Sequence, residues 1–128
     1  MELNVESGIK GIEEKEVLKT DTAAAYGSGL IEVFATPAMI ALMEMTCCQS
    51  VQKHLPEGLT TVGTEVKIKH TKATPLGMKV KCESELTEVD GKRLEFSVKA
   101  YDEQGLIGEG THQRFIINEK KFMERISK

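Results

Sequence analysis

One segment of the chain is almost wholly apolar and is expected to form a buried helix. Thr36-Pro37 is a strong helix start, because Thr can cap free N–H groups and Pro is favoured at the first helical position. Pro56-Glu57-Gly58 ends the pattern, so the helix is expected to run from Thr36 to about His54. Its first three turns are apolar on nearly all sides, which is typical of a helix surrounded by the rest of a fold.

After this helix the period of the apolar positions changes from 3.6 to 2. The alternation predicts strands over Val66 to His70, Val80 to Leu86 and Leu94 to Ala100, each with one buried and one exposed face. Asp90-Gly91 is a hairpin signal between the second and third of these strands. A turn at Gln104-Gly105 precedes a last strand, which is expected over Leu106 to Ile117.

The two ends of the chain show weaker patterns. Gly11 to Lys19 is expected to form an edge strand, Thr20 to Glu32 a loop, and Lys120 to Ile126 a short terminal helix. A loop of that length in a small domain often carries function. Because helices do not alternate with strands, the fold class is α+β, with an antiparallel sheet around one helix.

Composition fits one globular domain over residues 1–128. Apolar residues make up 40% and charged residues 29% of the 128 residues. The net charge of −3 gives no overall positive field, so no nucleic-acid partner is expected. The longest apolar stretch, Pro37 to Met43, is too short to span a bilayer, so no membrane partner is expected.

Cysteine and motif content narrow the chemistry further. Cys47, Cys48 and Cys82 are odd in number and form no CxxC pair, and Cys47 and Cys48 are expected in the core. Together with the lack of a secretory signal, this favours a cytoplasmic location. The histidines have no ligand spacing with the cysteines, so no metal site is expected. GxGxxG, Walker A and GxSxG patterns do not occur, and no cofactor is expected.

Glu44 is the most informative single residue. It is the only charged side chain between Pro37 and Cys48. A carboxylate in such surroundings must be paired, hydrogen-bonded, solvated by a cleft or protonated. Glu44 is therefore either a general base or nucleophile, or the one wet position of a buried helix. The pattern alone leaves both alternatives open.

Other residues near this helix also have two interpretations. Thr36 is either a helix cap or a hydroxyl placed where negative charge develops. It lies roughly 12 Å along the helix from Glu44, so a substrate lying along the helix can meet both. His70 and His112 are either satisfied structural residues or groups that move protons near neutral pH. Gly63 either begins a strand or lets a backbone N–H approach a ligand.

Several short motifs occur together in an order and spacing similar to those of one enzyme family. They are Val33-Phe34-Ala35-Thr36, Leu42-Met43-Glu44, Gly63-Thr64, His70-Thr71 with Ala73-Thr74-Pro75, and Gly110-Thr111-His112 with Arg114. From about Val33 to Phe122 the chain resembles the fluoroacetyl-CoA thioesterase-like branch of the hotdog-fold superfamily. The resemblance implies a hotdog fold, in which a five-stranded antiparallel sheet wraps one long buried helix, usually in a homodimer whose sheets join.

The resemblance also implies hydrolysis of an acyl-CoA thioester to a free acid and coenzyme A at the dimer interface. Thr36, Glu44 and His70 match the catalytic residues of the family, and Gly63 matches the glycine whose N–H binds the thioester carbonyl oxygen. Glu44 would activate water or attack the carbonyl itself, and Thr36 would assist that attack. His70 would polarise the carbonyl or stabilise the departing thiolate.

The remaining expectations concern substrate binding. Phe34 is expected to line the substrate site, and Arg114 to contact phosphates of coenzyme A. The family carries lid phenylalanines where this chain has Gly27-Ser28-Gly29-Leu30-Ile31, and Leu30 takes the place of an important lid aromatic. A short-chain or other acyl-CoA is therefore expected rather than a fluorinated substrate. A non-catalytic acyl-CoA binding module and a structural or regulatory dimer are the alternatives.

Overall fold

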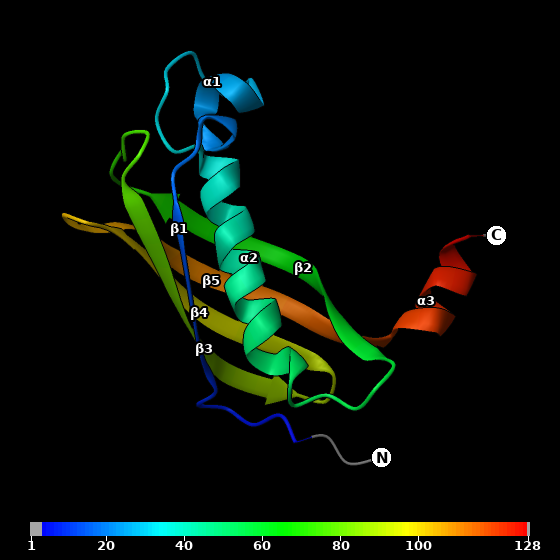
Figure 1. Cartoon of the computed structure of the whole chain (residues 1–128). Helices are drawn as coiled ribbons and strands as arrows, with labels where there is room; N and C mark the ends of the chain where they lie inside the picture. The colour runs from blue at the N-terminus through cyan, green and yellow to red at the C-terminus, as the bar shows by residue number, and fades with distance from the viewer. Residues whose placement is uncertain (1–3, 128) are drawn as a thin grey trace.

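A five-stranded antiparallel sheet curves around one long helix in the computed structural model, which describes residues 4–127 (Figure 1). The sheet has the strand order β1-β3-β4-β5-β2. Two hairpins, β3–β4 and β4–β5, form its centre, while β1 and β2 form its edges. The strands are β1 Lys10–Glu16, β2 Leu59–His70, β3 Lys79–Asp90, β4 Arg93–Asp102 and β5 Gly105–Asn118. The α+β class and the hairpin at Asp90-Gly91 are as the sequence predicted.

Helix α2, Thr36–Gln52, begins at the expected residue and ends two residues before His54. The prediction that Thr36 caps it is wrong. The cap position belongs to Ala35, whose backbone is extended at φ −73° and ψ 142°, whereas Thr36 is already the first helical residue. A side chain caps a helix only from that extended position, so the Thr36 hydroxyl is available for another partner.

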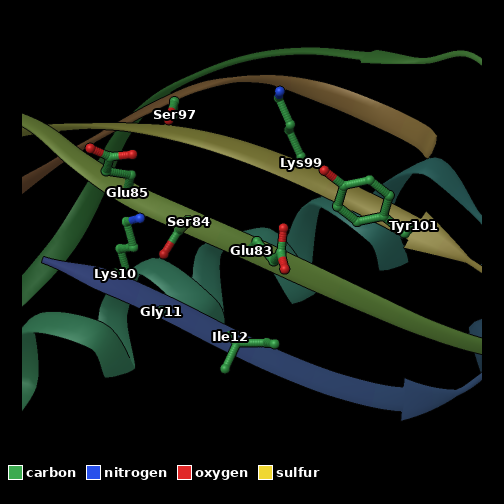
Figure 2. Close-up of a pocket in the computed structure, with 9 residues that line it drawn as sticks. All are labelled: Lys10, Gly11, Ile12, Glu83, Ser84, Glu85, Ser97, Lys99 and Tyr101. Carbon is green, nitrogen blue, oxygen red and sulfur yellow. The ribbon is translucent and has the colours of Figure 1, made fainter. Parts of the chain in front are cut away.

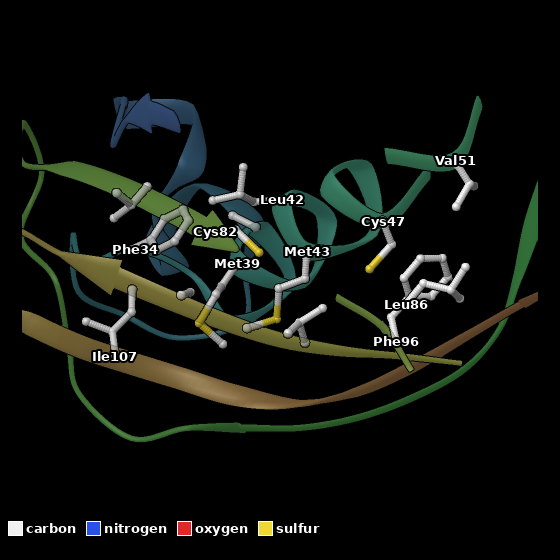
Figure 3. Close-up of a cluster of buried hydrophobic side chains, with 14 of the residues drawn as sticks. Phe34, Met39, Leu42, Met43, Cys47, Val51, Cys82, Leu86, Phe96 and Ile107 are labelled. Carbon is white, nitrogen blue, oxygen red and sulfur yellow. The ribbon is translucent and has the colours of Figure 1, made fainter. Parts of the chain in front are cut away.

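The core lies between α2 and the inner face of the sheet (Figure 3). Met39, Met43 and Cys47 of the helix are each at most 1% exposed. Burial raises the pKa of the Cys82 thiol to about 11 and raises that of Cys47 further still, which fits inert core thiols. Cys48 is only partly buried, so its expected place in the core is wrong.

Two glycines on the inner face of β5 let the sheet close around the helix. A Cβ on Gly108 would lie 2.7 Å from both Sδ and Cε of Met39, and a Cβ on Gly110 would overlap the carbonyl oxygen of Lys67. Because neither position can hold a side chain without a shift, the strand approaches α2 and β2 more closely than another residue would allow.

The free edge of the sheet differs from the sequence prediction. Strand β2 pairs only with β5 among the described residues, and it begins at Leu59 rather than near Val66. Val66 was expected on a buried face, but it is 39% exposed. It shares its side of the sheet with buried His112, yet it lies on the edge strand, beyond the cover that α2 provides.

The segment expected as a loop contains short helices. They are η1, Lys19–Asp21, and α1, Ala23–Tyr26, and the Thr22 hydroxyl accepts a hydrogen bond from Ala25 N–H. At the other end, α3, Glu119–Ile126, has no buried residue and projects past β2 (Figure 1). Over residues 4–127, no helix has both the length and the apolar character needed to cross a membrane.

Candidate active site

Thr36 and His70 form the first part of the site. Thr36 begins α2 and His70 ends β2, and Oγ1 of Thr36 is hydrogen-bonded to Nδ1 of His70 at 2.8 Å. The other ring nitrogen, Nε2, is buried and has no hydrogen-bond partner among the described residues. Burial lowers the pKa of His70 below its ordinary value of 6.5, although a backbone contact with Lys72 opposes this. The ring is therefore mainly neutral near pH 7.

An open cavity of about 270 Å³ adjoins this pair. Phe34, Thr36, His70 and Lys72 line it together with residues of the segment around α1. Phe34 thus borders the cavity next to Thr36, and its expected contact with substrate stays a prediction. Leu30 does not line the cavity and is 97% exposed, so one chain alone does not bring Leu30 to the site.

Glu44 and Gly63 form the second part of the site. Glu44 is half-buried on α2 and its carboxylate lies against β2. A Cβ on Gly63 would be only 3.0 Å from Oε2 of Glu44, 3.2 Å from Cε1 of His112 and 3.4 Å from Nη1 of Arg114. Glycine at this position thus leaves room for the three polar side chains to converge.

Arg114 is buried rather than available to a phosphate on the surface. It is 7% exposed, and its guanidinium donates to Oγ1 of Thr61 at 2.7 Å and to the Thr61 carbonyl at 3.0 Å. A third bond, of 3.1 Å, joins Nη1 to Nε2 of His112. The expectation that Arg114 binds coenzyme A phosphates does not fit this geometry, because these internal partners hold the guanidinium inside the sheet.

The two parts of the site do not meet within one chain. Thr36 and Glu44 are eight residues apart on α2, or roughly 12 Å along its axis. The structure brings Thr36 to His70 and Glu44 to Gly63, but it does not bring the four together. Residues 4–127 also contain no cluster of three His, Cys, Asp or Glu side chains suited to a metal ion.

A larger hollow of about 470 Å³ lies elsewhere, over β1, β3 and β4 (Figure 2). Its lining alternates Lys10 and Lys99 with Glu83 and Glu85, so the charges compensate one another. None of the residues predicted from the sequence to form the site lines it. The candidate catalytic residues therefore lie at the smaller cavity and at Glu44, and not in this hollow.

Solved structures identify the class of protein. A thioesterase superfamily member from Thermus thermophilus matches with a TM-score of 0.88 and 26% identity, over 96% of this chain and 91% of that one. A hot-dog-like protein from Thermanaerovibrio acidaminovorans matches with a TM-score of 0.85 and 25% identity, over 94% and 89%. The fold is thus that of the hotdog thioesterases, as the resemblance implied.

The family is more specific than the class. The model of the family described as fluoroacetyl-CoA-specific thioesterase, FlK, matches residues 17–120. The fluoroacetyl-CoA thioesterase of Streptantibioticus cattleyicolor is 41% identical over 95 residues, which are 74% of this chain and 68% of that protein. A structure of the fluoroacetyl-CoA thioesterase FlK matches with a TM-score of 0.91 and 33% identity, over 97% and 96%. The chain belongs to this thioesterase family and is a thioester hydrolase.

The sequence leaves His112 between a structural and a proton-moving role, and the structure places it next to Gly63 and Arg114. The period-2 pattern of β5 places Gly110, His112 and Arg114 on one face, which is visible in the sequence. Their place beside Glu44 depends on the register that pairs Gly63 with Arg114, and the sequence pattern does not determine that register.

Proposed function

We propose that this thioesterase hydrolyses an acyl-CoA with a short acyl chain at an active site shared between two subunits. The observation that carries the proposal is the separation of the Thr36–His70 pair from Glu44 and Gly63 within one chain. A second copy placed antiparallel along β2 reunites the two pairs across a two-fold axis.

The free edge of β2 supports this dimer. An unpaired edge strand presents a row of free N–H and C=O groups, which a second sheet can satisfy. If Gly63 lies opposite the partner subunit's His70, the two-fold axis falls midway, beside Val66 and Lys67. Val66 then lies next to the axis, where the partner strand covers it, which accounts for an apolar side chain that is 39% exposed in one chain.

The exposed side of α2 supports the same arrangement. The midpoint of Thr36 and Glu44 along the helix is Ile40, and the next residue, Ala41, is exposed. Met45, one turn further along, is 43% exposed. A small residue at the crossing point lets two antiparallel helices approach each other, and Met45 would be covered by the partner.

The chemistry follows from the groups that such a dimer collects. The Gly63 N–H donates to the thioester carbonyl oxygen and stabilises its developing charge. Glu44 takes a proton from water while the water oxygen attacks the carbonyl carbon, and the proton passes to the departing sulfur when the C–S bond breaks. Glu44 can instead attack the carbonyl directly and expel the coenzyme A thiolate as the C–S bond breaks, giving an anhydride that water then hydrolyses. Thr36, oriented by His70, assists the attack.

The substrate class follows from the lid and from the relatives. One solved structure is of a mutant of FlK in complex with fluoroacetate and CoA, and another is of a different FlK mutant in complex with acetyl-CoA. In this chain the exposed Leu30 stands in the lid segment where the family has an aromatic residue. We therefore propose a short aliphatic acyl-CoA, without selection for fluorine.

The first experiment replaces Glu44 with Gln, which keeps the shape and removes the charge. We expect E44Q to fold, to keep the mass of a dimer in light scattering and to lose most release of free thiol from acetyl-CoA. Glu109→Gln, an exposed carboxylate on β5, is the matched control and should retain full activity. Full activity of E44Q would end the proposal. Binding of acetyl-CoA in calorimetry by a wild-type chain that shows no turnover would favour the non-catalytic module.

The second experiment tests whether subunits share the site. T36A and E44Q are each expected to be inactive, and their subunits are mixed by joint refolding. If the site is shared, each mixed dimer has one intact site, and random pairing returns about a quarter of wild-type activity. If each chain holds a complete site, no activity returns.

The third experiment tests the edge through which the subunits pair. Val66→Glu should give a monomeric mass and lose activity, because a charge is buried at the axis. Ile12→Glu adds the same charge at an exposed position on β1, the opposite edge, and should remain dimeric and active. A dimeric V66E protein would contradict the assignment.

A further inference from the structure

We infer that His112 is a positioning residue that aligns Gly63 with Glu44. Its ring is held as the neutral Nδ1–H tautomer and fixes the backbone bulge next to Gly63. The inference rests on the proposed function, since it assigns a support to two residues of that site. His112 lies on the inner face of β5, is 2% exposed and stacks on Phe96 with 6.4 Å between ring centroids.

The hydrogen bonds of the ring determine its protonation state. Nδ1 is 2.7 Å from the carbonyl oxygen of Glu65, which can only accept, so Nδ1 carries the hydrogen. Nε2 is 3.1 Å from Nη1 of Arg114, which can only donate, so Nε2 offers its lone pair. A second proton would replace that bond with two opposed N–H groups and would add a positive charge beside the buried guanidinium.

This geometry also excludes His112 as the acid or base of the reaction. Both ring nitrogens are used within the fold, so neither reaches a substrate. Burial lowers the pKa of His112 and the nearby charge of Arg114 lowers it further, while the Glu65 carbonyl and the Glu44 carboxylate oppose these effects. The ring therefore differs in role from His70, whose Nε2 has no partner among the described residues.

The ring acts on a bulge in β2. Pairing with β5 passes from Gly63 opposite Arg114 to Glu65 opposite Gln113, so Thr64 is an extra residue. Bulges of this kind redirect the backbone and occur next to active sites. His112 binds the Glu65 carbonyl at one end of the bulge. At the other end, its Cε1 lies 3.2 Å from where a Cβ of Gly63 would be.

The same ring also steadies the charge beside Glu44. By accepting from Nη1 of Arg114, it holds the guanidinium together with the two bonds to Thr61. Nη1 of Arg114 and Oε2 of Glu44 then lie around the same small space over Gly63. They are 3.4 Å and 3.0 Å from the position that a Cβ of Gly63 would take. Loss of the ring would free both the bulge and the guanidinium.

Two variants separate positioning from mere support of the fold. His112→Asn can still donate to the Glu65 carbonyl from about the place of Nδ1, whereas His112→Leu loses both bonds. We expect H112L to lower kcat for acetyl-CoA hydrolysis by about tenfold or more, with KM changed by less than about threefold. We expect H112N to recover part of that loss. Phe96→Leu, which disturbs the same core without breaking these bonds, should lower stability and leave kcat unchanged.

A measurement on the wild-type protein tests the geometry even if H112L does not fold. Nitrogen-15 spectra of the labelled histidine ring should show Nδ1–H and no titration of this ring between about pH 5.5 and 8. An Nε2–H tautomer, or titration near the ordinary pKa, would overturn the inference. So would wild-type kcat in both H112L and H112N alongside an inactive E44Q, whereas an active E44Q would overturn the proposed function itself.

Discussion

Replacing Gly63 with Ala adds one methyl group where Glu44, His112 and Arg114 meet. The new Cβ would lie 3.0 Å from Oε2 of Glu44 and 3.2 Å from Cε1 of His112. Ordinary van der Waals contact begins at 3.4 Å, so the carboxylate must move by a few tenths of an ångström. Gly63 is not among the glycines with positive φ, so the backbone itself accepts Ala without strain.

The effect on folding is the difference between two opposing terms. Replacing Gly with Ala within a strand stabilises the folded state by roughly 0.5–1 kcal/mol, through the lower entropy of the unfolded chain. Crowding at a packed position costs about 1–3 kcal/mol. The net loss is therefore about 0–2.5 kcal/mol, which a domain with an ordinary stability of about 5–15 kcal/mol tolerates.

The effect on catalysis should be larger than the effect on folding suggests. A misplacement of about 1 Å at a reacting group costs about a hundredfold in rate. On this scale a shift of a few tenths of an ångström costs up to about tenfold, so we expect kcat/KM to fall about tenfold in G63A. This corresponds to about 1.4 kcal/mol of transition-state stabilisation.

The assay compares thiol release and urea unfolding in G63A and in a crowded control. Gly11 lies on β1, the edge strand opposite β2. A Cβ on Gly11 would lie 2.7 Å from both Oγ of Ser84 and Cβ of Ser50. G11A should therefore lose stability while its kcat/KM per folded enzyme stays at the wild-type value. Wild-type kcat/KM in G63A, or an equal loss in G11A, would refute the reasoning.

Three further predictions concern Thr36, the histidines and Gly110. T36A removes the hydroxyl bonded to His70 and should lower kcat about a hundredfold, and T36S should restore most of that loss. The urea midpoint of T36A should stay nearly unchanged, because an exposed hydrogen bond contributes only about 0.5–1.5 kcal/mol to stability. Burial lowers the pKa of His70 and His112, so the unfolded chain binds more protons; their contribution to stability is present above pH 6.5 and is lost as the pH falls. Urea unfolding from pH 8 to pH 5 should show this decline and should show less of it in H112N, and an identical decline in both proteins would contradict the assignment. G110A places a methyl group on the Lys67 carbonyl oxygen and should lower the free energy of unfolding by about 3 kcal/mol or more. A wild-type urea midpoint would contradict this, because it would mean that β2 and β5 move apart at no cost.

The sequence predicted the elements well where a single period persists. The apolar run after Pro37 and the alternation from Val80 to Ala100 both reflect local geometry, and the structure has the helix and strands there. The short helix Ala23–Tyr26 lies in the segment expected as a loop although its alanines favour helix, because 4 residues are too few to show a helical period. Local signals thus sufficed for most of the fold.

The site was harder to predict because it depends on relations between distant segments. The sequence is compatible with Thr36 as a helix cap or as a catalytic hydroxyl. Whether the helix begins at Ala35 or at Thr36 decides between a cap and a bond to His70, and the pattern does not resolve a single residue. The exposure of Val66 follows from the strand order, and the place of His112 follows from the register of β2 against β5. Neither relation is written in the periodicity of a single segment.

The contact between Met39 and Gly108 has a consequence for the range of acids this enzyme can release. Gly108 pairs with His70 across the ladder, and the flexible thioether of Met39 occupies the space that a side chain at position 108 would need. Met39 is fully buried and does not itself line the cavity beside Thr36 and His70. Under the proposed function, exchanging this one methionine for a shorter residue should loosen the packing around Gly108 and shift the preferred acyl length, while the side chains proposed for the reaction stay unchanged.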